Sequence, residues 1–177
     1  MIHSVEISTN GELDTIAKFK IDKFPLLISN VDSILKGINP ILELQLTSTF
    51  LTASECLVLA ENPQFANLKS LDLSCNPITA KGLVYLIDPA HSQFSEKLKR
   101  LVLFNCEIDH AQSNLISNEQ LQSVKCGFHV KHLNLSHNNL GNFLNFIVEF
   151  ELINGDMQTL LLNSCQLGDE VLINMAT

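Results

Sequence analysis

Residues Leu68 to Ile78 read LKSLDLSCNPI, with leucines at offsets zero, three and five, an asparagine at eight and an isoleucine at ten. This spacing is neither the 3.6-residue rhythm of an amphipathic helix nor a sustained two-residue alternation. Leu71 and Leu73 lie on the same side of a short strand, because successive side chains of a strand point to opposite faces. Offset zero marks the entry into that strand. Asn76 marks the turn away from it, and the final aliphatic residue folds back into the core.

The same pattern starts again at Ile41, Leu98, Val130 and Met157. The starts follow one another at intervals of 27, 30, 32 and 27 residues. One such coil cannot bury its own apolar side, so successive coils must stack, with their strands in one parallel sheet and the returning segments behind it. The further matching positions are Leu44, Leu46, Thr49 and Leu51; Leu101, Leu103, Cys106 and Ile108; Leu133, Leu135, Asn138 and Leu140; and Leu160, Leu162, Cys165 and Leu167.

Offset eight alternates between asparagine and a smaller residue, in the order Thr49, Asn76, Cys106, Asn138 and Cys165. The chain turns there inside the stack and leaves backbone N–H and C=O groups that need partners, which an asparagine amide supplies as both donor and acceptor. Together with the leucine spacing, this alternation resembles the ribonuclease-inhibitor class of leucine-rich-repeat proteins. The resemblance covers residues 41–177 well and 1–40 loosely. It implies an α/β leucine-rich-repeat solenoid: a right-handed superhelix of about five to six repeats with a parallel concave sheet and convex helices.

A single domain is expected, with five repeats in residues 41–177 and a divergent N-terminal repeat or cap in residues 1–40. A weaker sixth copy runs from Ile2 to Asn10, and the segment after it is longer than one return helix needs. That segment is expected to hold an extra helix at residues 32–37.

The segments after the turns are predicted to be helices. Thr52 and Glu55 have the spacing of a capping box. Thr79 and Asp169 are the expected N-caps of two further helices. An apolar i, i+3, i+4 stripe of two phenylalanines and an isoleucine within residues 143–147 predicts a helix face turned towards the sheet.

Residues at offsets two, four and six point away from the core, onto the concave face of the sheet. Most of them are small and polar, but the repeat that starts at Leu98 presents a charge, a β-branched residue and an aromatic side by side. Aromatic and arginine residues dominate binding hot spots, so we expect a protein partner here with Phe104 as anchor. The predicted binding residues are Arg100, Val102, Phe104, Asp72, His132, Asn134 and Leu161.

The composition of the chain limits the classes of partner that it can bind and the cellular compartment in which it is expected. A net charge of −8 argues against binding to nucleic acid, and no apolar run approaches the roughly 18 residues of a membrane span. The N-terminus lacks the basic start and apolar region of a secretory signal. Five cysteines, an odd number without a C-x-x-C pair, predict reduced thiols and a cytoplasmic location, which is the host-cell cytoplasm if the protein is a secreted effector.

The sequence contains no Gly-rich phosphate-binding loop, no G-x-S-x-G nucleophile elbow and no H-E-x-x-H motif. We therefore expect no enzyme activity and no cofactor. Cys126, His129 and His132 have spacings that zinc ligands use, but a loop and a strand would direct them apart, so no metal is predicted. Asp72 and His132 are two strands apart, about 10 Å, which is too far for a triad with Ser136.

The sequence therefore predicts a non-catalytic protein–protein interaction module. The alternative is the recognition arm of a larger enzyme or receptor, for example a ubiquitin ligase or a host-directed bacterial effector. The Trp-free composition, rich in Asn and Ile, suits a microbial effector. The chain stops at Thr177 without a polar capping segment, which is consistent with a fragment, with a tolerated open end, or with a homodimer through that end; a monomer is expected.

Overall fold

The computed structural model describes residues 4–9, 16–23, 41–109, 111–112, 116–117, 119–120, 124, 129–141 and 156–169, and for residues 4–17 the backbone alone. Several predicted features lie outside these residues. They are Ile2, Asn10, the extra helix at residues 32–37, the stripe within residues 143–147, and the helix expected after Asp169.

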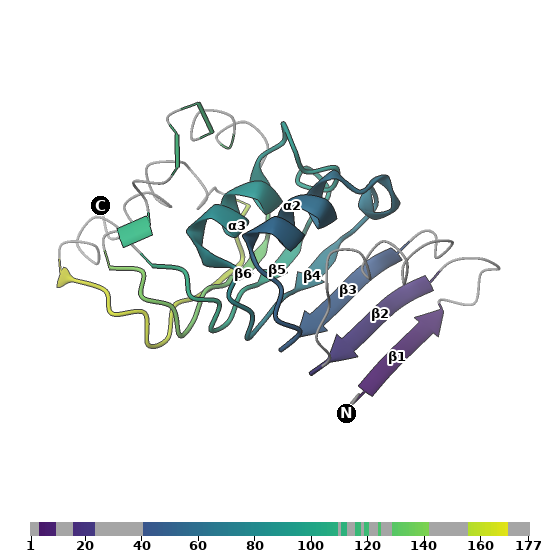
Figure 1. Ribbon diagram of the computed structural model, residues 1–177, viewed down its shortest axis with the longest axis horizontal. Coiled ribbons are helices and arrows are strands. Elements are labelled where there is room, and N and C mark those ends of the chain that lie inside the picture. The colour runs from purple at the N-terminus through teal and green to yellow at the C-terminus, as the bar shows by residue number, and fades with distance from the viewer. Residues whose placement is uncertain are drawn as a thin grey trace.

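Within the described residues, seven strands form one sheet in chain order. Strands β2 to β7 all run parallel to one another, which confirms the predicted stack of coils. Figure 1 shows the strands side by side, with the helices α2 and α3 on one side of the sheet. The strands are β1 (Ser4–Thr9), β2 (Ile16–Asp22), β3 (Ile41–Thr47), β4 (Ser70–Asp72), β5 (Arg100–Val102), β6 (His132–Asn134) and β7 (Thr159–Leu161).

Helix α2 (Ala53–Glu61) begins with the predicted capping box. The Thr52 backbone N–H donates to Glu55 Oε2 at 2.8 Å, and the Ser54 N–H donates to Thr52 Oγ1 at 3.3 Å. These bonds satisfy N–H groups that have no partner within the first turn of a helix. A short 3₁₀ helix, η1 (Pro63–Phe65), follows.

Helix α3 (Thr79–Ile87) begins differently from the prediction. Thr79 is not an N-cap: it is the first helical residue, and its backbone lies in the left-handed region at φ 68°. The free N–H groups are satisfied by the next coil, because Thr79 N–H donates to the Cys106 carbonyl at 3.1 Å and Ala80 N–H donates to Gln112 Oε1 at 2.8 Å. Contacts between coils replace the local cap that the sequence predicted.

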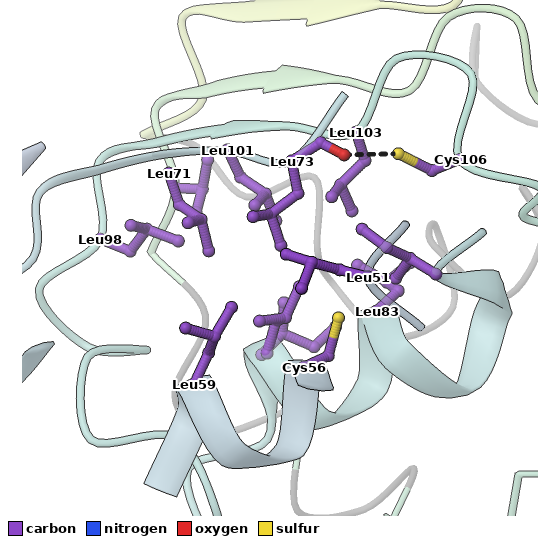
Figure 2. Close-up of a cluster of buried hydrophobic side chains, with 14 of the residues drawn as sticks. Leu51, Cys56, Leu59, Leu71, Leu73, Leu83, Leu98, Leu101, Leu103 and Cys106 are labelled. Carbon is purple, nitrogen blue, oxygen red and sulfur yellow. Dashed lines mark hydrogen bonds between the residues drawn. The ribbon is translucent and has the colours of Figure 1, made fainter. Parts of the chain in front are cut away.

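The leucines at offsets three and five form the core. Leu71, Leu73, Leu101 and Leu103 are all 0 % exposed. Figure 2 shows them between the sheet and side chains of α2 and α3. The register aligns offset three across five strands, as Leu44, Leu71, Leu101, Leu133 and Leu160.

The weak repeat predicted at residues 2–10 does not join the parallel stack. Strand β1 is antiparallel to β2, and the strand that pairs parallel with β3 is β2. Ile16, Phe19 and Ile21 of β2 pair with the residues at offsets zero, three and five of the next coil. The sixth coil therefore starts at Ile16, with phenylalanine where the other coils have leucine.

Offset seven has a left-handed backbone in all six coils of the described residues, at φ between 53° and 62°. A second left-handed residue follows in each coil except that of β2, whose next residues are not described. It lies at offset nine in the coils with Thr or Cys at offset eight, and at offset eleven in the coils with Asn. Two kinds of coil thus alternate along the stack. The offset-seven residues are Lys23, Ser48, Cys75, Asn105, His137 and Ser164; those at nine are Phe50, Glu107 and Gln166; those at eleven are Thr79 and Gly141.

Asn76 joins its own coil to the preceding one. Its Oδ1 accepts from the N–H groups of Thr49 at 2.8 Å and Leu51 at 3.1 Å. Its Nδ2 donates to the carbonyls of Leu46 at 2.7 Å and Leu73 at 2.8 Å. One buried amide therefore satisfies four backbone groups in two turns.

Asn138 repeats this arrangement one pair of coils later. It accepts from the N–H groups of Cys106 at 2.9 Å and Ile108 at 3.1 Å. It donates to the carbonyls of Leu103 at 2.7 Å and Leu135 at 2.8 Å. The polar role predicted for offset eight is confirmed.

The cysteines at offset eight contribute thiol donors. Cys106 Sγ donates to the Leu73 carbonyl at 3.3 Å (Figure 2), and Cys165 Sγ donates to the Leu135 carbonyl at 3.2 Å. Burial raises the pKa of Cys106 to about 12 and also raises the pKa of Cys165. Both thiols therefore keep the proton that they donate at neutral pH.

Leu103→Ala leaves a cavity in the middle of the stack and is expected to lower the free energy of unfolding by about 2–5 kcal/mol. Urea unfolding followed by circular dichroism measures this loss. The matched control is Leu161→Ala, because Leu161 is 41 % exposed. Equal losses in the two variants would contradict the register described above.

Asn76→Ala removes the partner of four buried backbone groups. At about 1–3 kcal/mol for each unsatisfied group, the free energy of unfolding is expected to fall by more than about 3 kcal/mol. The control is Asn163→Ala at an exposed position, where the change is expected to stay within about 0.5 kcal/mol. A loss below 1 kcal/mol for Asn76→Ala, measured in the same urea titrations, would refute the bridging role.

Stability is expected to fall at alkaline pH because of Cys106. Its pKa rises from 9.0 to about 12 on folding, so above pH 9 the unfolded thiol ionises while the folded thiol stays protonated. The free energy of unfolding then decreases as pH rises, by about 2 kcal/mol from this residue at about pH 10.5. Urea titrations near pH 7.5 and 10.5 should show a smaller decrease in Cys106→Ser. The same decrease in both proteins would count against this coupling.

Candidate functional site

The sheet has one face that α2 and α3 do not cover, called here the open face (Figure 1). It is the concave face of the sequence prediction. Because the residues at offsets three and five point into the core, their neighbours at offsets two, four and six point to the open face. The strand register then sets these residues in rows that run across the coils.

A hollow of about 330 Å³ lies on the open face over β5, β6 and β7. Two rows of paired residues form most of its lining, together with Leu133. Five of the seven predicted site residues are among them, so the structure brings these five together. One row is Arg100, His132 and Thr159, and the other is Val102, Asn134 and Leu161.

The two rows differ in chemistry. Arg100 and His132 are exposed, and His132 Nδ1 lies 3.2 Å from Thr159 Oγ1. In the second row, Leu161 is 41 % exposed and Val102 only 7 %. Val102 therefore lies at the floor of the hollow, since neighbouring strands flank it on both sides, and is not the exposed contact expected from its offset. The hollow is basic along one row and mainly apolar along the other.

Asp72 lines a second hollow, of about 610 Å³, over β3 and β4. Arg100 lines both hollows. The Asp72 Oδ1 atom accepts from Ser74 N–H at 3.0 Å and from Ser74 Oγ at 2.6 Å, so the carboxylate is held at the end of its strand. Asp72 is thus adjacent to the five converging residues rather than among them.

Phe104, the expected anchor, does not line either hollow. It is half-buried, and its ring packs against His137 with centroids 4.7 Å apart and a tilt of 50°. His137 is one of the left-handed residues at offset seven, so this contact depends on the turn geometry. Strand alternation alone did not predict it.

Thr159 and Leu133 line the hollow but are not among the predicted binding residues, and of the two Thr159 is the polar one. Thr159 lies at offset two, opposite His132, and its hydroxyl oxygen is 3.2 Å from the imidazole Nδ1 atom. Its only sequence signal was its place in a row with two basic residues.

The described residues hold no group of three His, Cys, Asp or Glu side chains that could bind a metal ion. Cys126 lies outside them. Strand β5 separates Asp72 from His132, and Ser136 is buried. In the described part of the chain, every helix is too short or too polar to cross a membrane.

A family model described as a leucine-rich repeat matches residues 66–86 and 128–142. The first match spans β4 and most of α3, and the second spans β6. With six parallel strands and the helices between them, the fold is an α/β leucine-rich-repeat solenoid. Leucine-rich repeats generally mediate protein–protein interaction and are typically not catalytic. No curated protein sequence matches the chain.

Proposed function

We propose that this chain is a non-catalytic binding module that docks a protein partner on its open face, centred on the hollow over β5, β6 and β7. The observation that carries the proposal is the convergence of exposed Arg100, exposed Leu161 and buried Val102 around one concavity. Concave, mainly apolar sites with a few polar groups are where binding concentrates. The general role of leucine-rich repeats supports the same function.

Leu161 and Arg100 are the residues expected to dominate the affinity. Burial of the aliphatic Leu161 side chain against a partner would be favourable, and the Arg100 guanidinium group offers several hydrogen-bond donors to it. Truncation of a central hot-spot residue costs about 2 kcal/mol or more. The Phe104 ring contributes only if the interface extends from the hollow to the turns.

Two finer assignments belong to this proposal. The alternation of two coil types supports a place in the ribonuclease-inhibitor-like class. A cytoplasmic location is supported by Cys106 and Cys165, because their S–H groups donate hydrogen bonds only while the thiols stay reduced. A monomer, an effector role and a place in a larger ligase remain predictions.

The test is affinity capture from a cell lysate, followed by titration of the captured partner against purified variants. Leu161→Asp and Arg100→Glu are each expected to weaken binding by at least about tenfold. The control is Lys81→Glu at an exposed position of α3, on the other side of the sheet. Circular dichroism checks that all variants are folded.

Unchanged affinity in both open-face variants would overturn the proposal. Equal weakening by Lys81→Glu would also overturn it, because the partner would then respond to net charge or to the helix side. Phe104→Ala, measured in the same series, determines whether the interface reaches the turns.

A further inference from the structure

A row of basic residues follows the edge of the sheet at which the strands begin. Lys69, Lys99 and Lys131 occupy offset one of three successive coils. The Lys99 N–H donates to the Lys69 carbonyl at 2.8 Å, and the Lys131 N–H donates to the Lys99 carbonyl at 2.9 Å. Their backbones are therefore about 4.8 Å apart from strand to strand. Together with Arg100, these three lysines are called the basic edge.

Among the described residues, no carboxylate forms an ion pair with the basic edge, although Glu43 and Asp72 line the same hollow as Lys69 and Arg100. The single ion pair in the described part of the chain joins His91 to Glu61 at 3.3 Å, and it involves none of the four basic side chains. Lys69, Lys99 and Arg100 are exposed, and Lys131 is half-buried. Four of the 11 Lys and Arg residues of a chain with 19 acidic residues thus gather at one place. Like charges this close repel one another, so an external anion is favoured there.

The opposite edge of the stack, at the turns, carries acidic groups. Glu107 and Asp109 line a hollow of about 460 Å³ there. The coil that starts at Leu98 is therefore basic where its strand begins, at Lys99 and Arg100, and acidic beyond the end of the strand, at Glu107 and Asp109. A charged partner has one favoured orientation across the coils.

We propose that the docking segment of the partner is an acidic segment of a protein, with carboxylates on the basic edge and an apolar side chain in the hollow. This inference rests on the proposed function and adds the chemistry of the partner. Arg100 connects the two features, because it belongs to the basic edge and also lines the hollow that contains Val102 and Leu161.

An acidic protein segment fits this surface better than a nucleic acid does. The apolar row that ends in Leu161 lies beside the charges, and a protein segment offers apolar side chains between its carboxylates. A polyphosphate backbone takes its affinity from many phosphate contacts, which a chain of net charge −8 opposes. The short range of screened charges, about 8 Å at physiological salt, lets the basic edge attract locally despite that net charge.

The probe for the test is a short fluorescent peptide of glutamate with leucine at every third position. A second peptide has glutamine in place of each glutamate, and a short DNA duplex serves as the phosphate competitor. Binding by fluorescence anisotropy is compared for the wild type, Lys69→Glu/Lys99→Glu, and Lys23→Glu/Lys81→Glu. The two double variants change the same number of exposed lysines, so their net charges match.

The glutamate peptide is expected to bind the wild type more tightly at lower salt. Binding is expected to weaken by about tenfold or more in Lys69→Glu/Lys99→Glu and with the glutamine peptide, and to change little in Lys23→Glu/Lys81→Glu. The inference is overturned by no binding of the glutamate peptide, by equal binding of the glutamine peptide, by equal weakening in both double variants, or by tighter binding of the DNA.

Affinities of the same variants for the captured partner distinguish a failure of this inference from a failure of the proposed function. If Leu161→Asp weakens its binding and Lys69→Glu/Lys99→Glu does not, the open face is the binding site and the acidic segment is wrong. If neither variant weakens binding, the proposed function itself is wrong.

Discussion

A buried amide at the turn of every second coil is the interaction on which the rest of the structure depends. Each coil must turn inside the stack, where water does not reach its N–H and C=O groups. Asn76 and Asn138 each satisfy two N–H groups of the preceding coil and one carbonyl in each of the two coils. These bonds hold neighbouring turns at a fixed distance, so the leucines of successive strands meet in one continuous core.

The alternation of coil types follows from the same bond. Because an asparagine already provides acceptors for the coil before it, that coil needs only a small donor at offset eight, and Thr49 or Cys106 supplies it. The backbone after offset eight differs accordingly, with its second left-handed residue two positions earlier in the Thr and Cys coils. Burial that keeps the Cys106 thiol protonated makes cysteine adequate for this role. Sequence and backbone geometry thus alternate for one physical reason.

The parts of the fold that depend on local spacing could be predicted from the sequence: the strand positions, the buried face, the role of offset eight and the cap of α2. Features that depend on contacts between coils could not. The coil that starts at Ile16 was not recognised, because it has Phe19 where the other coils have leucine. At the start of α3, the side chain of Gln112 accepts a hydrogen bond from the Ala80 N–H, and Thr79 does not act as the expected N-cap. At the candidate site, alternation predicted the rows that line the hollow. It did not predict the burial of Val102 by flanking strands or the packing of Phe104 on His137.

The core and the turns together occupy offsets zero, three, five, eight and ten, which leaves offsets one, two, four and six for the surface. The parallel register repeats each of these offsets on the neighbouring strand, so a residue type repeated along the sequence becomes a row on the molecule. Lysines at offset one thereby form a basic edge, and Val102 and Leu161 at offset four lie three residues further along their strands. Substitutions in these rows change the surface chemistry and leave the amide bridges and the core leucines in place. The residues that specify the fold of the solenoid are therefore distinct from those that determine the chemistry of its open face.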